Sequence, residues 1–462
     1  MKKLYFIGFI LFASLLTFTA SQVAETTAPP PPPGGNPILP TTPYAYEFDM
    51  PSHISLPGSG AYYGQDPIPN FFSITDEAAT LGRVLFYDTR LSLHDDLSCG
   101  SCHLQERSFA DDKQFSEGID MTAATRNTPN INDLGWRATN LFFWDMRENN
   151  LEDLALLPAL DENELGNDLA TIIDRVGDTP FYNELFIAAY GSSTVTEQRI
   201  SDALEQFMNS MTTFNTRWDE AAANNFQTLT TEEFEGRELF ELNCAVCHSP
   251  PNFTSNLVTV ANNGLDDDFS NDGGLGDVTG NPGDIGLFKS PTLRNIEMTA
   301  PYMHDGRFET LEEVIDFYSD SLKLNGANFQ ELELLETPSE TGFNFTDEEK
   351  EKLKIFLLTL TDESFLTDPR FSNPFPETVR TSIVELEGVQ VFPNPTVDVL
   401  QIKLPVDGKS TIYLTSTDGK TVFTDTTSSG DYLLERNGLA SGIYFLRIEA
   451  NAKIKTMKVV FE

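Results

Sequence analysis

Two copies of one five-residue pattern constrain this chain more than any other feature. Cys-Gly-Ser-Cys-His stands at residues 99–103 and Cys-Ala-Val-Cys-His at residues 244–248. The two thiols of each copy are one short turn apart, so they can form thioethers to the two vinyl groups of one haem while the adjacent imidazole reaches the iron. The alternatives are a redox Cys-x-x-Cys pair, which does not need the histidine, and a four-thiolate zinc site, which leaves both histidines unused. The pattern predicts two covalently bound haem c groups, held by Cys99, Cys102, His103, Cys244, Cys247 and His248.

The first 20 residues have the pattern of a secretory signal peptide. Lys2 and Lys3 precede an apolar run over residues 4–16, which is shorter than the roughly 20 residues of a membrane span. An anchor helix is the alternative. We expect an exported protein without a transmembrane segment after signal removal.

The net charge of −41, from 71 acidic and 30 basic residues, disfavours binding to nucleic acid or to an anionic membrane. A cationic partner would be attracted. The alternative is that the acidic surface only keeps an exported protein soluble.

With 462 residues the chain is long enough for two or three domains. We predict a mainly α fold with two cytochrome c-like haem domains in tandem, followed by a small all-β sandwich domain. The expected boundaries are a signal peptide at 1–20, a Pro-rich linker at 21–43, haem domains at 44–225 and 226–368, a linker at 369–385 and the sandwich at 386–462.

Local patterns support this division. Helix starts are predicted at Thr75, Thr230 and Thr346, the last two with a glutamate three residues later. Apolar residues three and four apart predict a buried helix face over residues 200–211. Residues 263–286 are rich in Gly, Asp and Asn and predict an irregular loop.

The last region instead alternates apolar and polar residues, for example over 399–404 and 443–448, with turns at Asp418 and Ser441. It contains no cysteine or histidine. It therefore offers no haem chemistry.

The chain between residues 65 and 362 resembles the dihaem bacterial cytochrome c peroxidase/MauG family. The segments that carry the resemblance occur in the same order and at similar spacings, at residues 81–91, 126–129, 142–145, 290–295 and 299–306. The resemblance implies a peroxidatic haem at His103 and an electron-relay haem at His248.

The resemblance also implies roles for two further side chains. Trp144 matches a tryptophan between the two haems, and Glu164 falls where the family has an acid/base glutamate over the peroxidatic iron. An ordinary buried aromatic and a solvated surface glutamate are the alternatives.

The chain departs from the family at two places near the first haem. Residues 118–125 contain no histidine where classical members have a ligand to the first iron, so we expect that iron to be five-coordinate or water-bound. Leu154 stands where the family often has a glutamine.

The sixth ligand of the second iron is expected to be Tyr318, which lies fourteen residues after His304, where classical members have a methionine and MauG-like members a tyrosine. Tyr318 also belongs to an apolar helix face, so a plain core role is the alternative. Met303 is the rival ligand.

The family also holds a calcium ion between its haem domains, and Asn127, Thr299 and Pro301 match those positions. His304 is then expected to support this region rather than bind haem. His53 and His94 have no assignment beyond surface or capping roles.

The end of the chain resembles the C-terminal sorting domain of type IX secretion substrates, through residues 391–395 and 439–446. This implies carriage across an outer membrane to the cell surface or the medium. The periplasm is the location usual for the haem family.

Three functions follow from these patterns. The first is a cytochrome c peroxidase that reduces hydrogen peroxide with electrons from a small cytochrome c or cupredoxin. The resemblance to classical members, which dimerise, implies a homodimer. The second is a MauG-like oxidase whose haems share oxidising equivalents and act on a protein or organic substrate. The third is a non-enzymatic electron-transfer cytochrome.

Overall fold

The computed structural model describes residues 35–48, 74–136, 141–254, 260–324, 326–329, 341–375, 384–386, 388–404, 409–416, 421–436, 438–450 and 453–461. The chain forms two compact units, of which the first ends at Pro374 and the second begins at Phe375. The signal peptide, His53 and the turn at Asp418 lie outside the described residues. Within the described ranges, no helix has the length and apolar character that crossing a membrane requires.

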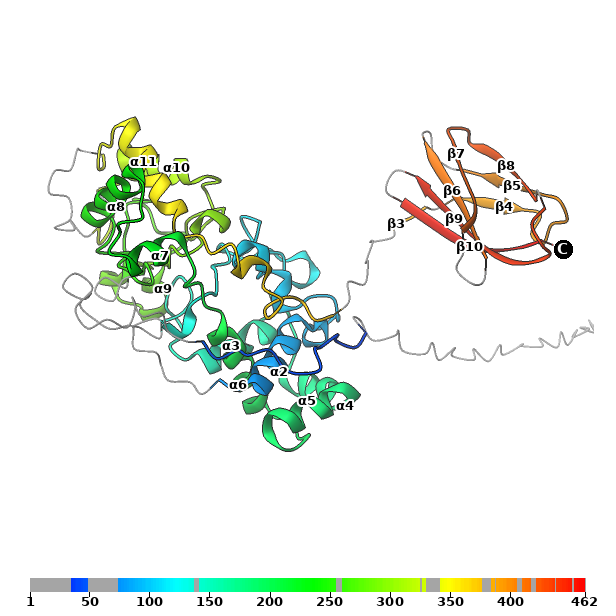
Figure 1. Cartoon of the computed structure of the whole chain (residues 1–462), viewed down its shortest axis with the longest axis horizontal. Coiled ribbons are helices and arrows are strands. Elements are labelled where there is room, and N and C mark those ends of the chain that lie inside the picture. Colours follow the sequence, from blue (N-terminus) through cyan, green and yellow to red (C-terminus); the bar gives the residue numbers. More distant parts are fainter. Residues whose placement is uncertain are drawn as a thin grey trace, which may run out of the picture. The chain divides into compact units, whose positions relative to one another are not determined.

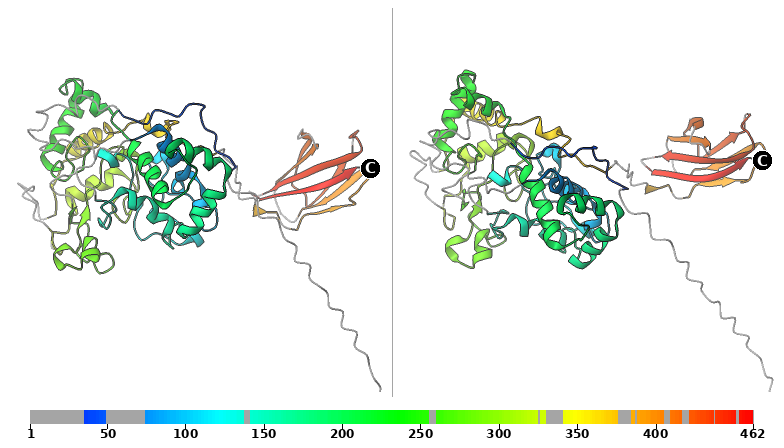
Figure 2. Two further views of the ribbon diagram at one scale, coloured as in Figure 1. Left: turned by 90° about the horizontal axis from the view of Figure 1, so that it is seen from below. Right: turned by 60° about the horizontal axis from the view of Figure 1, so that its bottom comes forward.

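The first unit is helical. Figure 1 shows α2 to α6 gathered on one side of it and α8, α10 and α11 on the other, and Figure 2 shows the same grouping from two further directions. The helices are α2 (Asp76–Tyr87), α3 (Leu151–Leu160), α4 (Leu169–Asp178), α5 (Pro180–Tyr190), α6 (Glu197–Ser210), α7 (Arg217–Ala223), α8 (Thr231–Asn243), α9 (Leu275–Thr279), α10 (Leu311–Asp320) and α11 (Asp347–Leu358).

The predicted helix starts are confirmed. Thr75 caps α2 by accepting a hydrogen bond from Ala78 N, and complete capping boxes open α8 at Thr230 and α11 at Thr346. The predicted apolar stripe over residues 200–211 is buried in α6 and at its C-cap. The predicted loop over 263–286 is mostly irregular and contains the short helix α9.

Each half of the first unit uses a glycine to bring two helices together. A Cβ on Gly82 of α2 would lie 1.9 Å from the carbonyl oxygen of Ala203 on α6, and a Cβ on Gly236 of α8 would lie 2.1 Å from that of Lys352 on α11. No side chain fits at these distances. The helix that precedes each Cys-x-x-Cys-His motif is therefore packed against a later helix, backbone to backbone.

Replacement of Gly82 by alanine should lower the free energy of unfolding by about 1–3 kcal/mol, because the added methyl group must push α2 away from α6. The matched control is Gly177→Ala in α4, where the new Cβ would meet only Val195 at 3.9 Å. That change should be neutral or stabilise by about 0.5–1 kcal/mol through helix propensity. Urea unfolding of both variants would measure their free energies of unfolding. Equal changes in the two variants would contradict a special role for the close contact at Gly82.

The structure corrects two linker boundaries. Part of the segment over residues 35–48 contacts the first unit, since Ile38 N donates to Pro374 O at 2.7 Å and Tyr46 is 1% exposed. The segment after residue 368 is packed too, since Tyr87 donates its hydroxyl to Phe371 O at 2.7 Å. The predicted linkers at 21–43 and 369–385 therefore both included residues that belong to the first unit.

The second unit consists of two sheets with one shared apolar core. The strands are β3 (Val384–Glu385), β4 (Gln390–Phe392), β5 (Val399–Lys403), β6 (Ser410–Ser416), β7 (Thr421–Thr427), β8 (Asp431–Glu435), β9 (Gly442–Ala450) and β10 (Lys453–Phe461). The orders are β3-β10-β9-β6-β7 and β4-β5-β8, antiparallel except for β3 beside β10. Side chains along β5 alternate between the core and the solvent. Leu400 and Ile402 are fully buried, whereas the preceding Val399 is 38% exposed.

Candidate functional site

The first motif turns tightly beside the end of α2. Its residues Cys99–Ser101 form a 3-10 turn. Only glycine fits its second position, because a Cβ on Gly100 would lie 2.4 Å from Cδ1 of Tyr87. Nδ1 of His103 donates to the carbonyl oxygen of Phe109 at 2.7 Å. The lone pair of Nε2 is therefore available to a metal.

The second motif follows directly from α8, whose C-cap residue is Cys244. Nδ1 of His248 lies 3.0 Å from the carbonyl oxygen of Pro291 and 3.2 Å from that of Phe253, so it too must donate from Nδ1. Burial lowers the pKa of both His103 and His248. Both imidazoles are thus held neutral and oriented, which is the form that ligates iron.

The residues of both motifs fit covalent haem. All four cysteines are free thiols. Burial raises the pKa of Cys99 and Cys244 to about 12 and that of Cys102 and Cys247 to about 11, so without a bound group they stay protonated thiols. A cavity of about 260 Å³ opens beside the second pair and its histidine, and one of about 340 Å³ beside Cys102.

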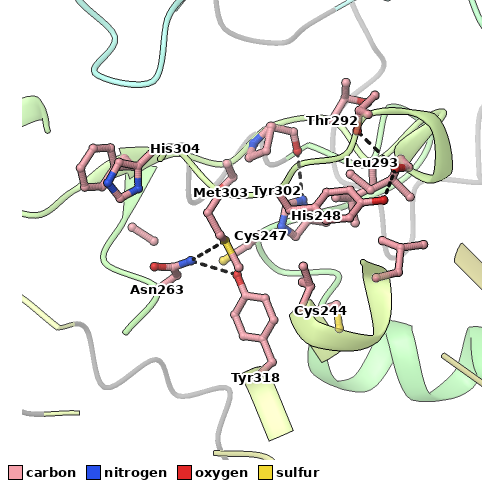
Figure 3. A pocket seen from close by; sticks show the side chains of 18 of the residues that line it. Cys244, Cys247, His248, Asn263, Thr292, Leu293, Tyr302, Met303, His304 and Tyr318 are labelled. Carbon is pink, nitrogen blue, oxygen red and sulfur yellow. Dashed lines mark hydrogen bonds between the residues drawn. The ribbon is translucent and has the colours of Figure 1, made fainter. Parts of the chain in front are cut away.

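The cavity at the second motif holds both candidate sixth ligands. Figure 3 shows Tyr318 and Met303 reaching the same point near His248. Asn263 joins them, because its Nδ2 donates to the Tyr318 hydroxyl at 3.1 Å and to Sδ of Met303 at 3.7 Å. Burial raises the pKa of Tyr318 to about 12, against the opposing hydrogen bond from Asn263. Tyr318 therefore faces the cavity as well as belonging to the helix α10.

Trp144 lies on the wall of the same cavity. Its indole Nε1 donates to the carbonyl oxygen of Asn127 at 2.8 Å, and its own carbonyl accepts from Lys289 N at 2.8 Å. The ring stands edge-on to His304 at 6.5 Å, and His304 stacks on Phe288 at 3.8 Å. The indole is thus fixed where the N-terminal half of the unit meets the second motif.

Arg126 fastens this junction. Its guanidinium donates to Asp145, and to both carboxylate oxygens of Asp272 at 2.8 and 2.7 Å. Asp145 directly follows Trp144, whereas Asp272 belongs to the loop over residues 263–286. One arginine therefore ties the tryptophan segment to the loop that carries Asn263.

The three residues matched to calcium also meet at this cavity. Asn127, Thr299 and Pro301 all line it. Nδ2 of Asn127 donates to the carbonyl oxygens of Lys113 and Gln114 at 3.1 and 3.2 Å. The structure brings the three residues together, and their role as calcium ligands stays a prediction.

Glu164 lies beside the first motif. Its carbonyl oxygen accepts from Ile119 N at 2.8 Å, and Gly118 allows this approach because a Cβ there would lie 1.8 Å from Asn163 O. The negative charge of Glu164 contributes to the raised pKa of both Cys99 and Cys102. Its carboxylate therefore lies within electrostatic reach of both thioether positions.

The surroundings of Glu164 favour its protonated form. Burial raises the pKa of its carboxyl, the nearby Asp161 raises it further, and Arg147 opposes both. Leu154, which stands where the family often has a glutamine, lies on α3 and is half-buried. A proton-exchanging carboxyl with a raised pKa is typical of an acid/base group.

The structure places one histidine at the first cavity that the sequence does not predict there. His94 lines the cavity together with Cys102 and Met121, and its Nε2 lies 3.4 Å from Oδ1 of Asp120. The sequence predicts only a surface or capping role for His94. The small number of histidines in the chain was the one signal that could have drawn attention to it.

Comparison with known proteins agrees with this geometry. Residues 76–227 match the family model for di-haem cytochrome c peroxidase, and residues 390–462 match that for the secretion system C-terminal sorting domain. The resemblances inferred from the sequence are thereby confirmed for both parts of the chain.

Individual relatives cover most of the helical unit. The cytochrome c551 peroxidase of Nitrosomonas europaea is 30% identical over 310 residues, which are 66% of this chain and 87% of the relative. The methylamine utilization protein MauG of Methylophilus methylotrophus is 29% identical over 306 residues, 61% of this chain and 88% of the relative. Among solved structures, a MauG-like protein associated with microbial copper homeostasis is 34% identical, with a TM-score of 0.59 over 66% of this chain and 95% of that one.

The diheme peroxidase BthA from Burkholderia thailandensis shares the fold at 22% identity, with a TM-score of 0.54 over 65% of this chain and 90% of that one. The two haem-attachment motifs and the cavities beside them point to the same family as these relatives. The chain belongs to the dihaem cytochrome c peroxidase/MauG family and ends in a secretion sorting domain.

Proposed function

We propose that the protein is a cytochrome c peroxidase that reduces hydrogen peroxide to water with electrons from a small cytochrome c or cupredoxin. The supporting observation is that the two motifs have unequal surroundings. The Glu164 carboxylate lies near Cys99 and Cys102, whereas Tyr318 and Met303 lie beside the second motif. A proton-transfer group suits a site of chemistry, and an additional ligating side chain suits an electron relay.

Each haem, when bound, supplies an iron that exchanges electrons, and peroxide is expected at the one held by His103. The carbonyl of Phe109 keeps that imidazole oriented. Glu164 takes a proton from one peroxide oxygen and returns it to the other. Trp144, fixed by its hydrogen bond to Asn127, lies on the electron path between the two motifs.

The wider architecture supports this role. The helical unit, which extends to Pro374, would comprise two haem domains that divide near residue 225, and the C-terminal unit would be a sandwich that directs export. The sorting domain favours the cell surface or the medium over the periplasm. The net charge of −41 favours a cationic electron donor.

A MauG-like oxidase acting on a protein or organic substrate is the second candidate. It is favoured by Tyr318 at the second cavity and by the 34% identity to a MauG-like structure. Electron transfer without turnover is the remaining alternative, and the proton-transfer position of Glu164 argues against it.

Spectra of the diferric holoprotein with and without hydrogen peroxide test the proposal. We expect a first haem that responds to peroxide, together with rapid oxidation of a reduced cytochrome in steady state. Negligible turnover with a long-lived oxidised species would favour the oxidase. A low-spin first haem that ignores peroxide in the wild type and in His94→Ala would contradict both enzymatic functions, and the variant is needed because His94 lines the first cavity.

Tyr318→Phe should change the low-spin signal of the second haem alone, because it removes a ligating oxygen and leaves the packed ring. It should also cost about 0.5–1.5 kcal/mol in stability through loss of the hydrogen bond from Asn263. The matched control is Met303→Leu, which removes the neighbouring sulfur. Electron paramagnetic resonance of both variants decides between Tyr318 and Met303 as the sixth ligand. A change in Met303→Leu alone would assign the ligand to methionine.

We also propose that Asn127, Thr299 and Pro301 contribute to one calcium site through oxygen atoms, as in the family. Their convergence on the wall of one cavity supports it.

A further inference from the structure

One side-chain amide contacts both candidate ligands of the second haem. Figure 3 shows the amide of Asn263 directed at both of them. Its Nδ2 lies 3.1 Å from the Tyr318 hydroxyl oxygen and 3.7 Å from Sδ of Met303. An amide nitrogen carries two hydrogens, so it can donate to both atoms at once. The two rival ligands therefore share one donor.

The orientation of this amide is fixed by its own loop. Oδ1 of Asn263 accepts a hydrogen bond from Leu265 N at 3.2 Å. Leu265 is 5% exposed, so its main chain is anchored by the burial of its side chain. Because Oδ1 is engaged by the main chain, Nδ2 is the atom that faces the cavity. The loop thus presents donors to the two ligands and no acceptor.

Packing holds the loop and the two ligands as one assembly. Leu265 belongs to the apolar cluster against which Tyr318 and Met303 also pack. Lys323 N donates to Gly264 O at 2.7 Å, which ties the loop to the chain that follows the helix α10. The distances between the amide and both ligands are therefore set by the fold.

The backbone of Met303 keeps its sulfur at the cavity. Met303 has a φ of 76°, a left-handed conformation that residues with a side chain rarely adopt. The turn is closed by a hydrogen bond from Gly306 N to Met303 O at 3.2 Å, and Tyr302 N donates to Phe308 O at 2.7 Å across it. Reach does not decide between sulfur and phenol, so their chemistry must.

The amide acts on the two rivals in the same direction. A phenolic oxygen that ligates ferric iron carries negative charge, so a hydrogen bond donated to it is roughly twice as strong as a neutral one. A thioether sulfur is neutral and a weak acceptor. An N–H directed at the sulfur also occupies a lone pair that iron would need. Both effects favour the oxygen of Tyr318.

We propose that Asn263 is the positioning residue that selects Tyr318 over Met303 as the sixth ligand of the second haem. The inference rests on the proposed function, in which the second haem is a ligated electron relay. Removal of the donor should lower the ratio of tyrosine to methionine ligation by about 10–100-fold, the equivalent of one hydrogen bond to a charged group. It should also lower the reduction potential of a second haem that keeps tyrosine, because the donor draws electron density away from the ligating oxygen.

The test is absorption and electron paramagnetic resonance spectroscopy of the ferric holoprotein in two variants. Asn263→Asp keeps the acceptor for Leu265 N and removes both donors, whereas Asn263→Leu removes donors and acceptor. Both should show more methionine-ligated second haem, including its near-infrared charge-transfer band, and Asn263→Leu/Met303→Leu should lack that band. The matched control is Asp266→Asn, which weakens the ion pair of the same loop with Arg307 and should keep the wild-type spectrum.

Reduction potentials give a second readout, which does not depend on the size of the methionine-ligated fraction. Methionine cannot bind in Met303→Leu, so adding Asn263→Leu to it should lower the potential of the second haem. The expected shift is about 59 mV for each tenfold change in the preference of the ligand for ferric over ferrous iron. A redox titration followed by absorption would measure it.

Unchanged ligation in both Asn263 variants, together with equal potentials in Met303→Leu and the double variant, would overturn the inference. So would a spectrum of Asp266→Asn that changes like that of Asn263→Asp, because the loop and not the amide would then be the cause. An unchanged low-spin signal in Tyr318→Phe would overturn the inference together with the ligand that the proposed function assigns. The two failures are therefore distinguishable.

Discussion

Replacement of Glu164 by glutamine should lower kcat for peroxide reduction by about 10²–10⁴-fold, the usual contribution of a positioned acid/base group. Glutamine keeps the size of the side chain, and the bond from Ile119 N is to the main chain, so the loop should stay in place. The amide cannot take a proton and return it. Steady-state oxidation of a reduced cytochrome would measure the loss, with KM for peroxide little changed.

The pH profile sharpens this test. Glu164 must be ionised to accept the first proton, and burial raises its pKa above the ordinary value. Activity of the wild type should therefore rise as the pH increases through that raised pKa, and this limb should vanish in Glu164→Gln. The matched control is Glu162→Gln, an exposed neighbour in the same loop. Equal kcat in the two variants would remove Glu164 from the mechanism.

Features that depend on neighbouring residues could be predicted from the sequence. In the caps at Thr75, Thr230 and Thr346, the threonine side chain accepts a hydrogen bond from the main-chain N–H three residues later, so local chemistry determines them. The haem motifs are equally local, since five consecutive residues supply both thiols and the imidazole. Helix periodicity likewise located α6 and its buried face.

Features that join distant segments could not be predicted. Arg126 and Asp272 are 146 residues apart, and Asn263 meets Tyr318 across 55 residues. The sequence around each of these residues does not indicate its partner, because only the folded chain brings the two residues of each pair together. The same reason hid His94 at the first cavity and the packed residues that were predicted as linkers. The family resemblance supplied Trp144 and Tyr318, which periodicity alone would have placed in the core.

Arg294 forms the most buried ion pair among the described residues, and its loss should be severe. The residue is fully buried. Its guanidinium holds both carboxylate oxygens of Asp219 at 2.8 Å and donates to the carbonyl oxygens of Thr213 and Pro251 at 2.7 and 2.8 Å. These partners come from three separate segments of the chain. Arg294 therefore joins α7, the irregular segment that precedes it and the segment that follows the second motif.

Arg294→Met should lower the free energy of unfolding by about 3–5 kcal/mol, because it removes the guanidinium that balances the buried negative charge of Asp219. Urea unfolding of the holoprotein would measure it. Adding Asp219→Asn should recover part of the loss, since asparagine carries no charge and can still accept from Thr216 N.

The matched control is Arg307→Met. Arg307 also holds two carboxylates, of Asp266 and Asp305, but its side chain is 33% exposed. Water and salt screen such a pair, so its loss should cost about 1 kcal/mol or less. If both arginine variants lost the same stability, burial would not be what makes the Arg294 pair strong. If the double variant were no more stable than Arg294→Met, the cost would come from the lost main-chain hydrogen bonds rather than from the stranded charge.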